Sequence, residues 1–246
     1  KAKDLNLLCM STPFDESSVD FLEELKVPAY KIASFENNHI NLIEKVAKTG
    51  KPVILSTGMM TLSELEETVQ CIKNTGNDNF ILLKCTSNYP ASNASSNLIT
   101  IPAMKKLFNC EVGLSDHTLG IGASIAAVAL GASIIEKHLT LNKKHKGPDH
   151  SSSLEPKEFI KFVERIRTTE EILGSHEKTP TKSEIRNINH ARKVIVASRS
   201  ISKGEKFNLK NVTVKRAGKG LSPLYWDKVI GSKAKKGYRA DQKIFI

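Results

Sequence analysis

The chain has 246 residues, enough to bury one sizeable core and carry a small second domain, and its 39% hydrophobic and 26% charged content is ordinary for a soluble globular protein. No apolar run approaches the roughly 20 residues of a bilayer span, and the first residues lead into no signal peptide, so we expect a cytoplasmic protein without a membrane partner. The formal charge of +11 is spread along the chain and aromatic residues make up only 6%, so we expect no nucleic-acid partner; the same charge suits either a field that favours anionic small substrates or a solvated surface.

The chain has four cysteines, which lie far apart in the sequence. Their spacing matches neither a zinc site nor a disulfide framework. We therefore expect reduced thiols at Cys9, Cys71, Cys85 and Cys110.

One pattern repeats from the start of the chain: a short apolar run ends in a polar residue, and an amphipathic, helix-like segment follows it. The runs begin about every 22 to 30 residues, which is the period of a βα unit and predicts a parallel sheet. The predicted strands are 6–12, 29–34, 52–57, 80–86, 110–116 and 132–139, and the predicted helices include 17–25, 42–49, 63–74, 123–130 and 156–173.

Polar residues at the ends of the runs favour a (β/α)₈ TIM barrel over an open doubly wound sheet. The first run is followed by no Gly-x-Gly-x-x-Gly turn, and in a barrel all strand carboxyl ends meet at one rim. Ser and Thr at these positions can also cap the following helices, and both roles can hold together. Six units are visible where a closed barrel needs eight, so we expect that two N-terminal βα units are missing from this chain. The residues expected at the rim are Thr12, Ser34, Glu36, Ser56, Thr57, Thr86, Ser87, Ser115, His117 and His138.

Two histidines follow neighbouring runs. His117 and His138 are separated by one helical crossover, so two adjacent parallel strands are expected to present their imidazoles at the same rim. The pair is a candidate metal site, and the alternative is a pair of hydrogen-bonded structural histidines.

The pattern changes after residue 139. Residues 147–156 (GPDHSSSLEP) form a long polar loop that is either an active-site lid or a solvated turn. Residues 175–186 are polar, contain Pro180 and lack periodicity, which predicts a linker, and short β-rich pieces follow at 193–197, 211–215 and 243–246. The predicted organisation is therefore a partial TIM-barrel domain at 1–174, a linker at 175–186 and a small β-rich domain at 187–246.

Motifs along nearly the whole chain resemble the sialic acid synthase (NeuB) family, whose C-terminal module is an antifreeze-like (SAF) domain. Members of this family condense phosphoenolpyruvate with an N-acetylated hexose aldehyde, giving a nine-carbon 2-keto acid and phosphate. The motifs are STPFDE at 11–16, KIASFE at 31–36, ILSTGM at 54–59, LLKCTSNYP at 82–90, GLSDHT at 113–118, IIEKHLT at 134–140 and GPDHSSSLEP at 147–156, followed in the SAF-like part by ISKGEKF at 201–207 and VKRAGKGLSP at 214–223.

The resemblance implies an enzyme that uses N-acetylmannosamine or a related N-acetylated hexose. A legionaminate or pseudaminate synthase, using a 2,4-diacetamido-trideoxy hexose, is the alternative, because different motifs lean toward different members. A second alternative is another phosphoenolpyruvate-dependent aldol-type synthase, which leaves the SAF-like tail unexplained. From a different class, the alternative is a non-catalytic carbohydrate-binding fragment.

The resemblance also implies roles for individual residues. His117 and His138 would hold Mn²⁺ or Mg²⁺ with open positions for the aldehyde oxygen, and Glu36 would join them as a catalytic residue. Lys31 in an apolar run needs a partner, which an anionic ligand supplies. The residues implied to bind phosphoenolpyruvate are Lys31, Thr12, Ser34, Ser56, Ser87 and Ser115, and those implied to bind the sugar are Glu36, Tyr89, Asp149 and Arg216.

Arg216 is implied to reach the partner's site across a domain-swapped homodimer. Two positions depart from the family pattern, because Ser87 stands where Asn is common and RAGKG at 216–220 replaces the more usual RPGNG. These departures leave the identity of the sugar open.

Overall fold

The structure, a computed structural model, describes residues 1–245 apart from the side chain at position 189. The chain divides into two compact units, Lys1–Gly174 and Ser175–Ile246. Along residues 1–245 no helix is long and apolar enough to cross a membrane. The four cysteines are free thiols.

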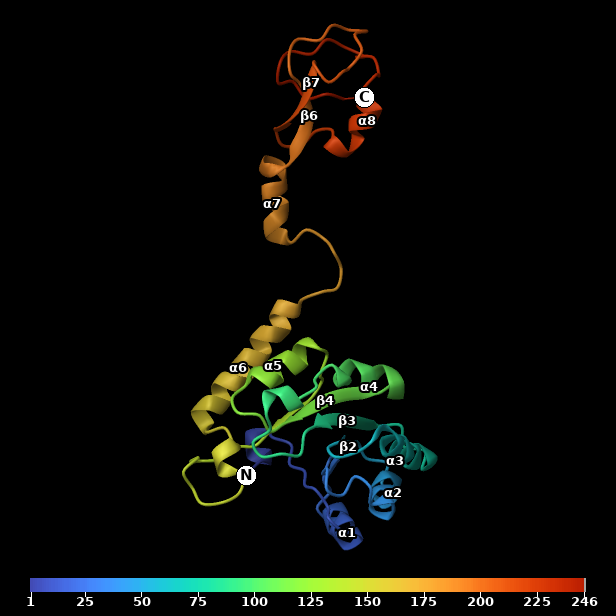
Figure 1. Ribbon diagram of the computed structural model, residues 1–246, viewed down its shortest axis with the longest axis vertical. Helices are drawn as coiled ribbons and strands as arrows, with labels where there is room; N and C mark the ends of the chain where they lie inside the picture. Colours follow the sequence, from blue (N-terminus) through green and yellow to red (C-terminus); the bar gives the residue numbers. More distant parts are fainter. Residues whose placement is uncertain (246) are drawn as a thin grey trace. The chain divides into compact units, whose positions relative to one another are not determined.

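The first unit is built on one parallel sheet whose strand order, β1-β2-β3-β4-β5, follows the chain (Figure 1). Because the order never reverses, the sheet has no switch point and curls in the manner of a barrel wall. The strands are β1 (Tyr30–Ile32), β2 (Val53–Ser56), β3 (Phe80–Cys85), β4 (Glu111–Asp116) and β5 (Ile135–Lys137). The helices are α1 (Glu16–Glu24), α2 (Ile40–Lys48), α3 (Leu62–Asn74), α4 (Thr100–Phe108), α5 (Gly122–Ala129) and α6 (Pro156–Leu173), with short 3₁₀ turns η1 (Lys3–Leu5), η2 (Asn93–Ser95) and η3 (His150–Ser152).

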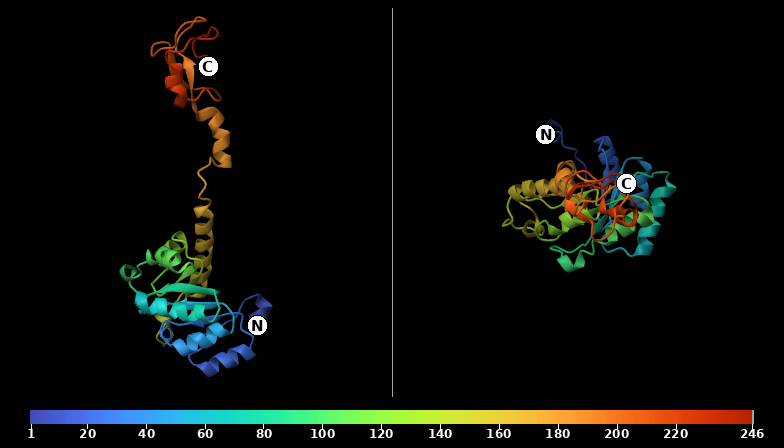
Figure 2. Two further views of the ribbon diagram at one scale, coloured as in Figure 1. Left: turned by 90° about the vertical axis from the view of Figure 1, so that its right-hand side faces the viewer. Right: turned by 90° about the horizontal axis from the view of Figure 1, so that it is seen from above.

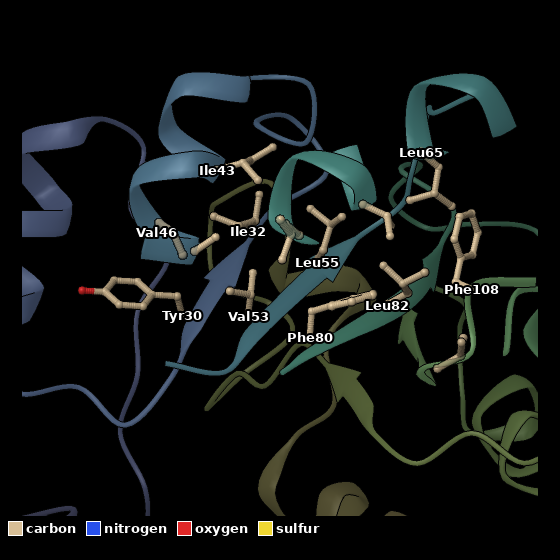
Figure 3. Close-up of a cluster of buried hydrophobic side chains, with 14 of the residues drawn as sticks. Tyr30, Ile32, Ile43, Val46, Val53, Leu55, Leu65, Phe80, Leu82 and Phe108 are labelled. Atoms are coloured by element: carbon tan, nitrogen blue, oxygen red, sulfur yellow. The ribbon is translucent and has the colours of Figure 1, made fainter. Parts of the chain in front are cut away.

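The core lies between the sheet and the helices. Successive strand residues point to opposite faces, so Ile32, Leu55 and Leu82 share the face that the helices cover. Figure 3 shows Ile43 of α2 and Leu65 of α3 above these strand residues. The opposite face of the same strands carries apolar residues such as Ile54 and Leu83 and, near the carboxyl ends of the strands, the polar side chains of the site described below.

Helix α6 packs against α5, and both lie beside the sheet (Figures 1 and 2). Its bounds are those predicted from the sequence, because Pro156 occupies the first turn and Glu155 and Glu158 form a capping box. The preceding loop contains η3, where Thr140 Oγ1 lies 2.7 Å from His150 Nδ1. The role of this loop as a lid stays a prediction.

The second unit is a small β-rich module. Strands β6 (Lys193–Ala197) and β7 (Val212–Arg216) pair in antiparallel fashion, and the turn η4 (Pro223–Tyr225) leads into α8 (Trp226–Val229). Ile195, Phe207 and Ile244 are buried in its own core.

The structure differs from three sequence predictions about the elements. The run 6–12 forms no strand, and its side chains 6–11 are exposed, Leu8 by 87%. An apolar run becomes a strand only with a neighbour to complete its hydrogen bonds, and nothing pairs with it among residues 1–245. The described residues therefore form an open five-stranded sheet, where six strands of a closed eight-stranded barrel were expected.

The second difference concerns the linker at 175–186, because helix α7 (Lys182–Ala191) begins inside it, while its role as a domain boundary stays a prediction. The sequence does contain a helix-start signal, since Thr181 and Glu184 form a capping box, but the polar composition of the segment led us to predict an irregular linker. The third concerns 243–246, where Lys243 makes only a single bridge to Val196; residue 246 lies outside the described residues.

Thr61→Ala is expected to destabilise the first unit by about 1 kcal/mol, because the Thr61 hydroxyl accepts the Glu64 backbone N–H at the start of α3. Urea unfolding measures the change. Thr100→Ala is the matched control, since Thr100 bonds only the carbonyl of Asn97 and caps no helix; equal effects of the two substitutions would contradict the capping role.

Candidate active site

A cavity of about 420 Å³ lies at the carboxyl ends of the five parallel strands, on the face turned away from the helices. The strand pleat places polar side chains there at alternate positions. Eight residues that the sequence predicted for the site line this cavity: Thr12, Lys31, Ser34, Ser56, Tyr89, Ser115, His117 and His138.

Lys31 is buried in the floor of the cavity. Its Nζ donates to Ser56 Oγ at 2.8 Å and lies 3.5 Å from Glu136 Oε2. The lysine therefore has a partner within the chain before any ligand binds, because a carboxylate already faces it, and its role in binding an anionic ligand stays a prediction. Glu136 also accepts a hydrogen bond from Ser115 Oγ at 2.6 Å, so one carboxylate joins the strands β1, β4 and β5.

Glu136 is a site residue that the sequence reasoning missed. It stands two positions before His138 on the same strand, and side chains two apart share one face of a sheet. The period-two rule could therefore have found it. Lys137, between them, points to the other face.

The two imidazoles lie together, with ring centroids 5.2 Å apart, and the Tyr89 ring is 4.1 Å from His117. His117 Nδ1 lies 3.0 Å from the Thr86 carbonyl oxygen, which can only accept, so Nδ1 carries the proton and Nε2 is the free nitrogen. His138 Nδ1 faces Asp149 Oδ2 at 3.8 Å.

Burial works to lower the pKa of His117, but hydrogen bonds to the Cys85 thiol and the Thr86 carbonyl hold it above its ordinary value. Burial, together with the neighbouring His117, lowers the pKa of His138. His138 is therefore the imidazole that is neutral over the wider pH range.

This arrangement fits a metal held by two imidazoles. A metal-ligating histidine usually gives its other ring nitrogen to a carbonyl or carboxylate, and both histidines here have such a neighbour at Nδ1. Within residues 1–245 no group of three His, Cys, Asp or Glu side chains is placed to hold an ion. At this position the described residues could therefore offer a metal two imidazole ligands.

Four predicted residues lie outside the lining of the cavity. Glu36 is half-buried, burial raises its pKa, and its Oε2 is buried without a hydrogen-bond partner in the described part of the chain. Ser87 lines a separate cavity, beside Cys85. Asp149 is in the loop before η3, next to His138. Arg216 ends β7 in the second unit and is exposed.

Gly58 is a second residue that the sequence reasoning passed over as a site residue. Its backbone N–H donates to Ser34 Oγ at 3.1 Å, and a Cβ at this position would collide with the hydroxyls of Ser34 and Ser87. Only glycine lets both hydroxyls approach the end of β2 so closely.

A buried ion pair fixes the strand ends that carry the histidines. Asp116 of β4 and Lys137 of β5 are each 1% exposed, and Oδ2 lies 3.0 Å from Nζ. Ser124 of α5 donates to the same Oδ2 atom, and Thr118 donates to Oδ1. Burial works to raise the pKa of Asp116, but these hydrogen bonds and the Lys137 charge hold it below its ordinary value.

Comparison with known proteins identifies the family. Residues 1–178 match the NeuB family and residues 192–244 match the SAF domain. The N,N'-diacetyllegionaminic acid synthase of Campylobacter jejuni is 44% identical over 245 residues, covering 99% of this chain and 73% of that protein. The pseudaminic acid synthase of the same species is 41% identical over 235 residues, covering 96% and 68%.

Solved structures agree with this assignment. The N-acetylneuraminic acid synthetase of Leptospira borgpetersenii superposes with a TM-score of 0.72 at 39% identity, over 76% of this chain and 65% of that one. The phospho-2-dehydro-3-deoxyheptonate aldolase of Thermotoga maritima has a TM-score of 0.64 at 22% identity, over 70% and 53%, a likeness that shows a shared TIM-barrel-like fold alone. The chain therefore belongs to the NeuB family and is an enzyme of the nonulosonic acid synthase type.

Proposed function

We propose that the enzyme condenses phosphoenolpyruvate with an N-acetylated hexose aldehyde, giving a nine-carbon 2-keto acid and inorganic phosphate. The observation that carries the proposal is the meeting of Lys31, Ser56 and Ser115 with two imidazoles in one cavity. A cation with hydroxyl donors suits an anionic phosphoenolpyruvate, and a pair of imidazoles beside it suits an electrophilic aldehyde.

The reaction forms one carbon–carbon bond, between C3 of phosphoenolpyruvate and the aldehyde carbon. The aldehyde oxygen takes up a proton, one water adds at C2, and phosphate leaves as the keto group forms. Lys31 and the Ser56 and Ser115 hydroxyls bind the anionic groups and hold C3 toward the histidines. Mn²⁺ or Mg²⁺, when bound by His117 and His138, would polarise the aldehyde oxygen.

Glu36 is proposed to act as an acid or base at the edge of this site. Burial raises the pKa of its carboxyl group, and a carboxyl group with a raised pKa is better suited to donate or accept a proton near neutral pH than an exposed one. Tyr89 and Asp149, which lie beside the histidines, complete the sugar contacts near the metal. Arg216 is proposed to contact the N-acetyl group, through a homodimer in which the second unit of one copy serves the other.

Two sugar classes are compatible with the relatives. N-acetylmannosamine and 2,4-diacetamido-trideoxy hexoses differ at the far end of the molecule from the aldehyde, so both present the same reacting groups to the cavity. Phosphate release by the protein encoded by the whole gene, measured with phosphoenolpyruvate, Mn²⁺ and each sugar in turn, tests the proposal. We expect release that depends on one of the two sugars. Absence of release with both would favour another acceptor or a binding protein.

Lys31→Met is expected to lower kcat/KM for phosphoenolpyruvate by about 100-fold or more. The substitution keeps an unbranched side chain of similar size but removes a positive charge that faces the proposed anionic substrate, and it takes the ammonium group of Lys31 away from Glu136. Steady-state kinetics at saturating sugar measure the effect.

Lys48→Met is the matched control, since Lys48 is exposed on α2 and pairs only with Glu44. If the two variants had similar kcat/KM values, Lys31 would not be the phosphoenolpyruvate-binding cation.

A further inference from the structure

A second cavity, of about 570 Å³, lies on the opposite side of β3 from the proposed active site. Its lining comes from the carboxyl ends of β2 and β3 and from the helices α3 and α4. Cys85 borders both cavities, but Lys31, Ser56 and the histidines border only the first. The second cavity is therefore separate from the site at which we place the reaction.

Lys84 is the charged group of this second cavity. On β3, Phe80 and Leu82 face the helices and Cys85 faces the proposed active site, so the pleat turns Lys84 toward the helices. Its Nζ donates to the Cys85 carbonyl at 3.0 Å and to Thr86 Oγ1 at 3.1 Å. An ammonium group has three donors, so one N–H is left for another acceptor.

Lys84 can be compared with Lys137, a lysine that also lies near a strand end and also points toward the helices. Lys137 of β5 is paired with the buried carboxylate of Asp116, whereas Lys84 has no acidic side chain near enough to perturb its charge within residues 1–245. Burial lowers the pKa of Lys84, as expected for a half-buried ammonium group without a carboxylate beside it in the described residues. A bound anion would supply that counter-ion.

The remaining walls restrict the kind of anion. Met59, Met60 and Met104 line the cavity together with Leu62 and Leu65, and methionine side chains adapt to ligands of irregular shape. Most hydroxyls of the lining already donate, those of Thr57, Thr86, Ser95 and Thr100 to backbone carbonyls and that of Thr61 to Glu64, which leaves the Ser87 hydroxyl and the Asn97 amide as further donors in the lining. A dianionic phosphate would find one cation and few free donors, whereas a monocarboxylate with an aliphatic group satisfies both the ammonium and the apolar walls.

We propose that the cavity between β3 and the helices α3 and α4 is a second ligand site, which binds a small aliphatic carboxylate through Lys84. The ligand's carboxylate accepts the free N–H of Lys84, and its hydrocarbon part packs against the three methionines. The proposal goes beyond the synthase function and does not depend on it, because the two sites share neither their cation nor their proposed ligand.

The test uses the methionine methyl groups as reporters. The protein is labelled with ¹³C at the methionine methyls, the resonances are assigned by single Met-to-Leu replacements, and 3-methylbutanoate is added up to about 100 mM, well above the millimolar affinity expected for a ligand with so few atoms. We expect saturable shifts of the Met59, Met60 and Met104 methyls. Met10 lines neither cavity and is the internal control, so its methyl should stay in place.

Two comparisons isolate the charge. The uncharged 3-methylbutanamide should bind the wild-type protein at least about tenfold more weakly than the carboxylate does. The carboxylate should likewise bind the Lys84→Gln variant at least about tenfold more weakly than it binds the wild-type protein. Lys106→Gln, an exposed site on α4, should behave as wild type. The proposal is overturned if the shifts of the three methyl resonances do not saturate with ligand concentration. It is also overturned if the carboxylate and the amide bind the wild-type protein equally well, a comparison that does not depend on the folding of any variant.

Discussion

His138→Ala is expected to weaken Mn²⁺ binding by more than about 100-fold and to lower turnover by about 1,000-fold or more. Within residues 1–245 two imidazoles meet at the proposed metal site, so the substitution would remove half of the proposed ligands, and loss of even an outer neighbour of a ligand typically costs 10- to 100-fold in affinity. A fall of about 1,000-fold corresponds to about 4 kcal/mol of lost transition-state stabilisation, within the range expected when a metal no longer polarises a carbonyl.

Calorimetric titration of the protein with Mn²⁺ measures the binding directly, so the result does not rest on activity alone. His176→Ala is the matched control, because His176 is an exposed histidine in the second unit, outside the cavity. Unchanged Mn²⁺ affinity in the His138 variant would contradict the proposal that His117 and His138 together bind the metal.

Asp116→Asn is expected to destabilise the protein by about 3–5 kcal/mol. The amide can still accept hydrogen bonds from Thr118, but it leaves the Lys137 ammonium buried without its counter-ion, and breaking one side of a fully buried pair typically has an effect of this size. Urea unfolding of the variant measures the loss. Because Asp116 and Lys137 directly precede His117 and His138, the variant should also loosen the position of both imidazoles.

Glu111→Gln is the control for this prediction, because it breaks an ion pair of the same strand at the surface. Glu111 and Lys105 lie 2.8 Å apart, but their side chains are 52% and 42% exposed, so less than about 1 kcal/mol is expected. If both substitutions changed the free energy of unfolding equally, burial of the Asp116–Lys137 pair would not be what stabilises the strand ends.

The sequence predicted correctly the elements whose formation depends on residues that are close together in the chain. Helix α6 begins at Pro156 and ends at Leu173 as predicted, because proline suits the first helical turn and the apolar residues recur at helical spacing. Strands β2 to β4 lie inside the predicted runs for a similar reason, since most of their residues are buried and apolar residues begin or follow closely on the start of each.

The sequence reasoning failed where the outcome depends on a partner distant in sequence. The run 6–12 has the composition of a strand but finds no neighbouring strand in the described residues. The pairing of Lys31 with Glu136 joins residues 105 positions apart, so it follows from the curl of the sheet and the register of strands that share no local pattern. The unpaired charge of Lys84 is likewise visible only once the helices around it are in place.

The proposed active site is tested most directly by a crystal structure of the protein with phosphoenolpyruvate and Mn²⁺, in which the manganese is located by its anomalous signal. We predict one anomalous peak bound by the imidazoles of His117 and His138, and phosphoenolpyruvate held by Lys31 in the same cavity. A manganese peak away from both histidines, or phosphoenolpyruvate bound elsewhere while this cavity is empty, would contradict the proposed site.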